Sequence, residues 1–271
     1  MDLQTKKPQK NIVIVGGGPA GMKAAITAID YGHKVTLFEK SEKLGGLINI
    51  SDLDERKIDL RNYRNYLVNK VTNSEVMVKL NQEARPETIK ELNPDVVIVA
   101  VGSVPNTPPV KGVDLPNVIQ AVDAYSMIPE IGQKVVILGG GEVGCELALT
   151  LAESGREVQI IEMEDQLIPL GNRFYKNSFQ ILFAKQKYLS WKTETVCTEI
   201  TENGVKAKTK GSNEIFYEAD TVILATGMTP LKKLAESFYG IVYDVKMIGD
   251  CVKPRQVSNA TYEGFFAITS L

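Results

Sequence analysis

The sequence predicts an α/β protein made of two Rossmann-like dinucleotide-binding domains, with the second domain inserted in the first. The main observation is an internal repeat, because Lys10–Leu44 aligns without a gap on Gln133–Leu167. A second match joins Asp95–Pro105 to Asp220–Pro230, and in each copy an apolar run ends in a glycine. A strand, a glycine-rich turn, a helix and a strand in this order are typical of a parallel βαβ unit. The chain therefore encodes this unit twice.

Both copies contain the pattern G-x-G-x-x-G between an apolar strand and a helix. Its glycines are Gly16, Gly18 and Gly21 in the first copy, and Gly139, Gly141 and Gly144 in the second. The first glycine permits the tight turn, the second lets a pyrophosphate approach the backbone, and the third lets helix and strand pack closely. The helix N-terminus then offers N–H groups to the phosphates. Because the required context occurs twice, the pattern predicts two dinucleotide sites.

Each second strand of the repeat ends in a glutamate, Glu39 or Glu162, at the same spacing from its glycine loop. A carboxylate at this position can accept hydrogen bonds from the hydroxyls of an adenosine ribose. After Glu162, the residues Met163, Glu164 and Asp165 offer no arginine to bind a 2′-phosphate. The second site is therefore expected to prefer NADH to NADPH.

The composition is that of a globular protein that can bury two cores, since the chain has 271 residues and is 44% hydrophobic and 24% charged. A net charge of −2 gives no reason to expect nucleic acid or a membrane surface as a partner. The longest apolar run, Val96–Val101, is too short to cross a bilayer, and the first ten residues lack the apolar core of a signal peptide. The expected location is the cytoplasm.

The three cysteines, Cys145, Cys197 and Cys251, are widely spaced, and the chain has a single histidine, His33. This pattern predicts neither a metal site nor a C-x-x-C dithiol. Cys145 is expected to pack in the helix after the second glycine loop. Cys251 follows Asp250 and is expected to be either buried, the usual fate of a free cysteine, or reactive.

The other elements follow from local patterns along the chain. The first half is expected to contain strand 11–15, helix 19–31, strand 34–38, a helix from about 55 to 70, and strands near 75–79 and 95–101. The second half is expected to contain a short helix at 123–128, the second glycine unit from 133, a helix at 173–187, an antiparallel meander at 190–217 and a final helix from about 258. The helix at 173–187 is expected to face the core with Phe174, Ile181, Leu182 and Tyr188.

The last segment is too short to form a domain, so it is expected to complete the first one. The expected domains are residues 1–107 with 240–271, which would bind FAD, and residues 108–239, which would bind NAD(H).

Taken together, the motifs resemble the two-dinucleotide FAD/NAD(P)-binding flavoprotein fold. They are GGGPAG with Glu39, Leu44-Gly45-Gly46, GGGEVGCE with Glu162, ATG at Ala225–Gly227, and IGDC with Pro254-Arg255 and the following ATYEGF. More narrowly, they resemble the C-terminal FAD/NAD(P)-binding region of the 2,4-dienoyl-CoA reductase, enoate reductase and trimethylamine dehydrogenase group. The resemblance covers nearly the whole chain.

The resemblance implies FAD at the first site and a nicotinamide dinucleotide at the second. The FAD-binding residues would be Gly16, Gly18, Pro19, Ala20, Gly21, Glu39, Lys40, Gly45, Gly46, Ala100, Gly102, Gly249 and Asp250. The NAD-binding residues would be Gly139, Gly141, Glu142, Val143, Gly144, Glu162 and Gly227. Glu146 matches a glutamate near the nicotinamide in related reductases, and an ordinary helix-surface glutamate is the alternative. For Asp250, the alternative to a flavin contact is a cap on the last helix.

The implied function is an FAD-dependent oxidoreductase module that takes hydride from NADH onto FAD. In the resembled family, an N-terminal barrel carries FMN and an iron–sulfur cluster, and nothing in this sequence supplies them. The electron acceptor is therefore expected on such a barrel or on a separate acceptor protein. The alternative is a non-catalytic module, since one branch of the family keeps ADP where others hold FAD. Asp250 and Gly45-Gly46 concern the flavin half and favour FAD.

Overall fold

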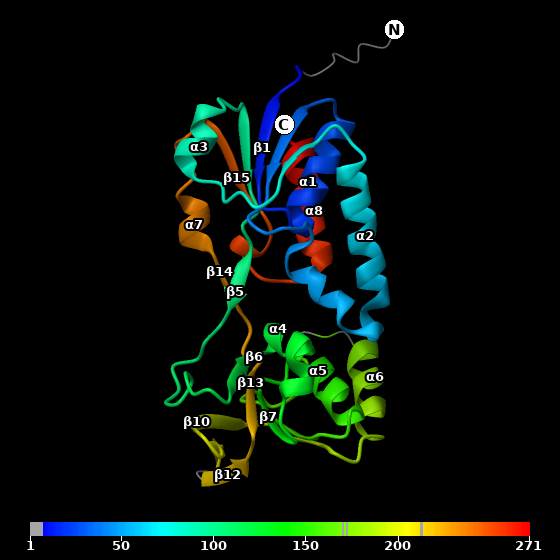
Figure 1. Cartoon of the computed structure of the whole chain (residues 1–271), viewed down its shortest axis with the longest axis vertical. Helices are drawn as coiled ribbons and strands as arrows, with labels where there is room; N and C mark the ends of the chain where they lie inside the picture. The colour runs from blue at the N-terminus through cyan, green and yellow to red at the C-terminus, as the bar shows by residue number, and fades with distance from the viewer. Residues whose placement is uncertain (1–7, 170, 172, 212–213) are drawn as a thin grey trace. The chain divides into compact units, whose positions relative to one another are not determined.

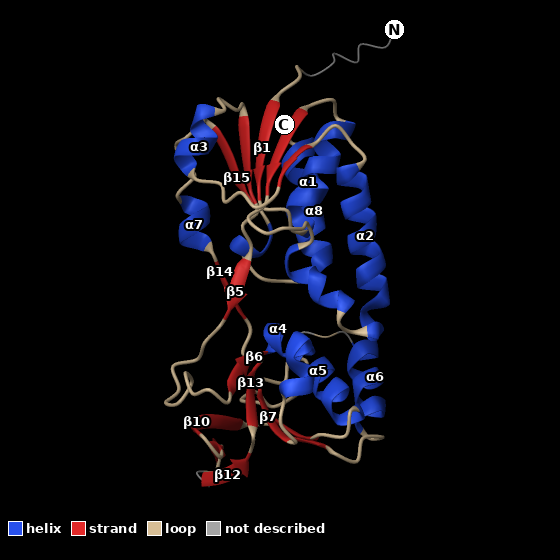
Figure 2. Ribbon diagram, viewed as in Figure 1, coloured by secondary structure: helices blue, strands red, loops and turns tan. Residues whose placement is uncertain are grey.

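The computed structural model describes residues 8–169, 171, 173–211 and 214–271, which form two compact units (Figures 1 and 2). One unit runs to Val104 and resumes at Thr229, and the other is Pro105–Met228. Residues 105–107, expected in the first domain, belong to the second unit. Residues 229–239, expected in the second domain, belong to the first unit. The reason is that Ala235 and Phe238 are fully buried in a hydrophobic cluster of the first unit. The first seven residues of the expected first domain lie outside the described part of the chain.

The first unit is built on a five-stranded parallel sheet with the order β15-β4-β1-β2-β3. Its strands are β1 (Asn11–Val15), β2 (Lys34–Phe38), β3 (Met77–Lys79), β4 (Val96–Val99) and β15 (Asp244–Met247). The central strand β1 is buried on both faces, which explains its unbroken apolar run. The carboxyl ends of β1, β4 and β15 lie at one edge of this sheet.

Helices cover both faces of the first sheet (Figure 1). The core on one face is shared with α1 (Pro19–Asp30), α2 (Ile58–Thr72) and α8 (Val257–Thr269). The core on the other face includes residues of α3 (Pro86–Glu91) and α7 (Lys232–Glu236). Short 3₁₀ segments complete the unit at η1 (Gly46–Asp52), η2 (Glu55–Lys57) and η4 (Gly249–Cys251). A two-layered cover of this kind is typical of a doubly wound sheet.

The second unit repeats the arrangement with a five-stranded parallel sheet, β6-β13-β7-β8-β9. Its strands are β6 (Val118–Gln120), β7 (Lys134–Leu138), β8 (Glu157–Ile161), β9 (Leu189–Lys192) and β13 (Thr221–Leu224), and its helical segments are α4 (Ala121–Ala124), η3 (Tyr125–Glu130), α5 (Glu142–Glu153) and α6 (Arg173–Phe183). An antiparallel meander of β10 (Thr195–Thr201), β11 (Gly204–Thr209) and β12 (Glu214–Glu218) shares a core with the sheet. Residues 190–192, expected in the meander, instead pair with β8 as part of β9.

The two passages of the chain between the units pair with each other. β5 (Ser103–Pro105) and β14 (Met228–Pro230) form a two-stranded sheet. Within the described ranges, no helix is long and apolar enough to cross a membrane.

The predicted core face of α6 is wrong. The side chain of Ile181 is 59% exposed, and Leu182 and Tyr188 are also exposed, whereas Phe179 and Phe183 are buried. Phe179 packs on Phe183 with ring centroids 5.7 Å apart. Two aromatic residues four positions apart share one helix face, and here they displace the aliphatic pair from the core. The side chain of Phe174 lies outside the described part.

Small residues let α1 and α8 approach closely in the first unit. A Cβ atom on Gly264 of α8 would overlap the carbonyl oxygen of Ala20 and lie 3.1 Å from the amide nitrogen of Ala24. Both contacts are with backbone, which cannot turn aside as a flexible side chain can. Gly264 is therefore required by helix packing.

We predict that Gly264→Ala destabilises the fold by about 1–3 kcal/mol, because the added methyl group forces the two helices apart. The measurement is the urea unfolding midpoint. Asn259→Ala is the matched control, since Asn259 is exposed on the same helix and its replacement should leave the midpoint nearly unchanged. An unchanged or higher midpoint for Gly264→Ala would show that this packing is not tight.

Candidate functional site

A cavity of about 510 Å³ opens at the carboxyl ends of β1, β4 and β15 in the first unit. This is the edge where ligands bind in open parallel sheets. Most of the predicted first-site residues line it, namely Gly16, Gly18, Pro19, Ala20, Glu39, Lys40, Gly46, Ala100, Gly102, Gly249 and Asp250. The other two predicted residues, Gly21 and Gly45, are not part of the lining.

The three glycines of the first loop have different surroundings. Gly16 has φ of 108°, and a Cβ atom there would overlap the carbonyl oxygen of Ala100. A Cβ atom on Gly21 would overlap the carbonyl oxygen of Gly16. Around Gly18, in contrast, a Cβ atom would meet nothing within 4 Å. The loop thus leaves free space beside its middle glycine, where a pyrophosphate would approach the backbone.

Glu39 fixes the glycine loop from the end of β2. Its side chain is buried, with 7% exposed. Its Oε2 atom accepts a hydrogen bond of 2.8 Å from the amide of Gly17, and its Oε1 atom accepts bonds from the amide and hydroxyl of Ser41 at 2.8 and 2.6 Å. The carboxylate therefore stands at the cavity wall in one orientation, with acceptor capacity left for a ribose hydroxyl.

Asp250 marks another part of the cavity, where α8 begins. Its carboxylate accepts hydrogen bonds of 3.4 Å from the Ser103 hydroxyl and the Arg255 amide. Burial raises the pKa of Asp250 above its ordinary value. On α8, Glu263 accepts a 2.7 Å bond from the Gly249 amide and another from the Arg255 guanidinium. The first residues of α8 also line the cavity, so the partial positive charge of the helix N-terminus lies close to the cavity.

The second glycine loop has the same geometry as the first. Gly139 has φ of 109°, and a Cβ atom there would overlap the carbonyl oxygen of Ala225, while a Cβ atom on Gly141 would meet nothing within 4 Å. Glu162 is buried and accepts hydrogen bonds from the amides of Gly140 at 2.5 Å and Glu164 at 2.8 Å. The structure thus brings the predicted glycines of this loop together with Glu162.

The second site is more open than the first. Glu142 is partly exposed, and Val143 and Gly227 are exposed. A cavity of about 480 Å³ in this unit is lined by residues at the amino ends of β7, β8 and β9, and so it does not contain the predicted residues. Glu146, which follows Gly144 on α5, accepts a 2.6 Å hydrogen bond from the hydroxyl of Tyr175 on α6.

One position differs between the two copies. In the first, the Gly45 amide donates to the Gly17 carbonyl at 2.9 Å, and Gly45 has φ of 121°. In the second, the Ile168 amide donates to the Gly140 carbonyl at 2.7 Å, and Ile168 has φ of 51°. A positive φ is unfavourable for a β-branched residue. The buried side chain of Ile168 and this hydrogen bond hold the conformation in place.

Sequence reasoning missed Ser41, Ser103 and Glu263 as parts of the site. Ser41 acts partly through its backbone amide, which leaves no signal in the sequence. Glu263 lies well beyond the glycine–aspartate motif that it supports, and only its place on α8 brings it back to Gly249. The described residues contain no group of three or more potential metal ligands.

A family model described as pyridine nucleotide-disulphide oxidoreductase matches residues 10–264. Among curated relatives, an NADH oxidase from Thermoanaerobacter brockii is 39% identical over 97% of this chain and 41% of its own length. A cinnamate reductase from Clostridium sporogenes is 34% identical over 97% of this chain and 39% of its own. The chain thus spans about two fifths of the length of these relatives.

Solved structures agree with the sequence relatives. A 2-naphthoyl-CoA reductase in complex with 2-naphthoyl-CoA has a TM-score of 0.90 and 31% identity, over 97% of this chain and 40% of its own. A thioredoxin reductase from T. acidophilum has a TM-score of 0.74 and 21% identity, over 98% of both chains, and that likeness concerns the fold alone. The predicted flavoprotein fold and the predicted resemblance to the enoate and dienoyl-CoA reductase group are both confirmed.

The three cysteines are separate, free thiols. Cys145 and Cys251 are fully buried, and burial raises the pKa of Cys145 to about 12 and that of Cys251 above its ordinary value. Burial also raises the pKa of the partly exposed Cys197 to about 11. All three are therefore protonated at neutral pH, which favours the packing role over the reactive one for Cys251.

We predict that iodoacetamide at pH 8 modifies Cys197 slowly in the folded protein, and modifies Cys145 and Cys251 only after unfolding. The thiolate is the reactive form, and each raised pKa keeps its population small at this pH. Mass spectrometry of the alkylated peptides gives the order of modification. Rapid labelling of Cys251 in the folded protein would contradict this assignment.

Proposed function

Because the chain belongs to the pyridine nucleotide-disulphide oxidoreductase family, we propose that it takes hydride from NADH onto bound FAD and passes the electrons to an acceptor outside the chain. The observation that carries the proposal is the pair of matching glycine loops. Each has open space beside its middle glycine and a buried glutamate bonded to its own loop. Two such loops on one chain suit two dinucleotides.

The residues of the first cavity fit FAD. Gly18 leaves room for the pyrophosphate, and Glu39 is in place for the adenosine ribose. Asp250 and the N-terminus of α8 would face the flavin half, where the helix dipole stabilises negative charge. When bound, FAD would supply the ring that accepts hydride, and the residues of the cavity would hold that ring in place.

The second site suits NADH in two respects. Its open surface allows a cofactor to enter and leave, and the Glu162 carboxylate would repel a 2′-phosphate. The Tyr175 hydroxyl holds Glu146 in one orientation on α5. In this proposal, Glu146 helps to position the nicotinamide ring.

The acceptor would lie in the part of the relatives that this chain does not span. The relatives include a cinnamate reductase and a 2-naphthoyl-CoA reductase, and both match over about two fifths of their length. We therefore place the acceptor on an FMN- and iron–sulfur-containing barrel or on a separate protein. An unsaturated organic acid or its CoA thioester would be the final substrate class.

A pair of matched variants tests the proposal. Wild-type protein supplied with FAD should retain the flavin, and anaerobic NADH should bleach its absorbance near 450 nm. Gly18→Val should lose the flavin, because its side chain would fill the space beside the loop. Gly141→Val should retain the flavin but resist bleaching, because the same space is filled at the other site.

The variant pair also shows which outcome refutes the assignment. Flavin retention by Gly18→Val would mean that the first loop does not hold the pyrophosphate. Unchanged bleaching in Gly141→Val would mean that NADH does not bind at the second loop. If wild-type protein retains ADP but not FAD, the chain is a non-catalytic nucleotide-binding module.

We expect wild-type protein to prefer NADH, and Met163→Arg to improve kcat/KM for NADPH about tenfold. Met163 follows Glu162 and is 66% exposed, so an arginine there can reach a 2′-phosphate without disturbing the core. Met163→Gln is the uncharged control. Steady-state rates with a dye acceptor measure the preference, and equal use of both cofactors by wild-type protein would contradict the role given to Glu162.

A further inference from the structure

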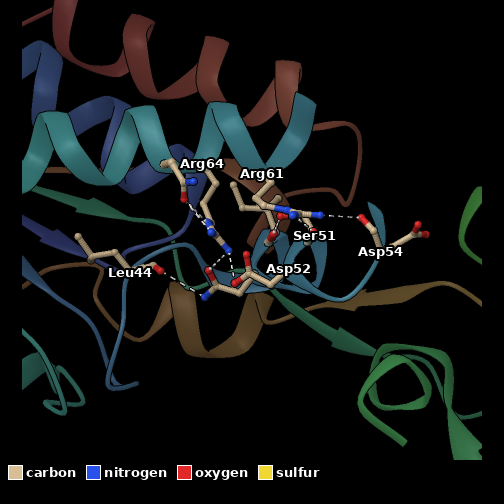
Figure 3. A network of polar contacts seen from close by, with 9 residues as sticks. Leu44, Ser51, Asp52, Asp54, Arg61 and Arg64 are labelled. Carbon is tan, nitrogen blue, oxygen red and sulfur yellow. Dashed lines mark hydrogen bonds and ion pairs between the residues drawn. The ribbon is translucent and has the colours of Figure 1, made fainter. Parts of the chain in front are cut away.

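Segment η1, which forms one wall of the first cavity, is fastened to helix α2 by two arginines (Figure 3). Arg64 donates a 2.6 Å hydrogen bond to Oδ2 of Asp52. Arg61 donates bonds of 3.0 and 3.2 Å to the carbonyl oxygens of Ser51 and Asp54. The last residues of η1 and those that follow it are thereby tied to α2.

Asn49 extends the same network to the cavity. Asn49 lines the cavity, and its side chain donates a 3.2 Å hydrogen bond to the carbonyl oxygen of Leu44. Its Oδ1 atom accepts a bond of 3.4 Å from Arg64. A Cβ atom on Gly45 would overlap this amide, so the glycine makes room for it. Arg64 is therefore one side chain removed from the cavity.

Arg64 has the properties of an anchor. It is only 9% exposed although it is charged, and it also donates to the Asn65 side chain at 2.7 Å. Its guanidinium, by hydrogen bonding to the Asp52 carboxyl, holds the pKa of that carboxyl below the usual range. The same helix buries Leu67 and Val71 in the core of the unit. A planar guanidinium on a rigid helix fixes several acceptors at once.

Segment η1 begins next to the place where the pyrophosphate would lie. Gly46 lies beside Gly18, since a Cβ atom on Gly46 would be 3.1 Å from the Cα atom of Gly18. The contacts of Glu39 and the glycine loop serve the adenosine and the pyrophosphate, which ADP shares with FAD. The wall formed by Leu47, Ile48 and Asn49 is additional to them.

We infer that Arg64 is a positioning residue that makes the first site select FAD over ADP. By holding Asp52 and Asn49, it keeps the wall at residues 46–49 in the place that the flavin half requires. The inference rests on the proposed binding of FAD in this cavity. It predicts that replacement of Arg64 weakens the binding of FAD and leaves the binding of ADP nearly unchanged.

The test compares the Kd of FAD and of ADP, both by calorimetric titration of the apoprotein. Arg64→Gln should raise the Kd of FAD about tenfold or more and change the Kd of ADP by less than about twofold. The reason is that the variant loses the hydrogen bonds that hold the wall beside the flavin half, which ADP lacks. Arg64→Lys should give an intermediate effect, since it keeps the charge but not the fork. Arg56→Gln is the matched control, because Arg56 pairs at 3.2 Å with Asp54, which lies outside the wall at residues 46–49. This variant should leave both Kd values unchanged.

The outcomes distinguish a positioning role of Arg64 from a purely structural one. Equal weakening of FAD and ADP by Arg64→Gln would overturn the inference and assign Arg64 a purely structural role, and so would two unchanged Kd values. If that variant does not fold, Asp52→Asn decides, because it removes the charged partner of Arg64 and leaves the cavity-lining side chains in place. A selective loss of FAD in Asp52→Asn supports the inference, and an unchanged FAD-to-ADP ratio overturns it. Failure of wild-type protein to bind FAD would instead refute the proposed function.

Discussion

Each glycine loop in this protein depends on a buried glutamate that binds the loop of its own unit. Glu39 and Glu162 accept hydrogen bonds from the amides of Gly17 and Gly140, respectively. A buried carboxylate is costly unless it is well hydrogen-bonded, so the contact fixes both partners together. The open space beside the middle glycine follows from this fixed turn. Loss of the glutamate would therefore affect the shape of the loop as well as the recognition of a ribose.

The two loops share a backbone geometry but differ in what surrounds them. The first is enclosed by η1, η4 and the start of α8, which together border a cavity of about 510 Å³. The second has exposed neighbours such as Val143 and Gly227. Under the proposed function, enclosure suits a flavin that stays bound through many turnovers, and an open surface suits a nicotinamide that must exchange in each one. The same βαβ unit would thus serve a resident and an exchanging cofactor.

The sequence could predict those parts of the site whose residue types are dictated by the backbone. The glycines of both loops and the glutamates at the strand ends are of this kind, and the structure brings them together. Ser41 binds Glu39 through its amide as well as its hydroxyl, and Glu164 binds Glu162 through its amide. Almost any residue can provide such an amide, so the sequence gives no signal for these contacts. Arg64 and Asn49 meet only through the packing of α2 against η1. On α6, aliphatic and aromatic residues both had helical spacing, and only tertiary packing selected Phe179 and Phe183 for the core.

The left-handed conformation of Ile168 shows that the two copies keep one backbone path with different residues. Its counterpart in the first copy, Gly45, adopts a positive φ without steric cost, whereas a β-branched residue is strained there. The amide nevertheless makes the same contact with the glycine loop in both copies. The second copy thus keeps the same main-chain path with a residue type that is strained in this conformation. The strain at Ile168 must therefore be offset by its buried side chain and by the hydrogen bond to the Gly140 carbonyl.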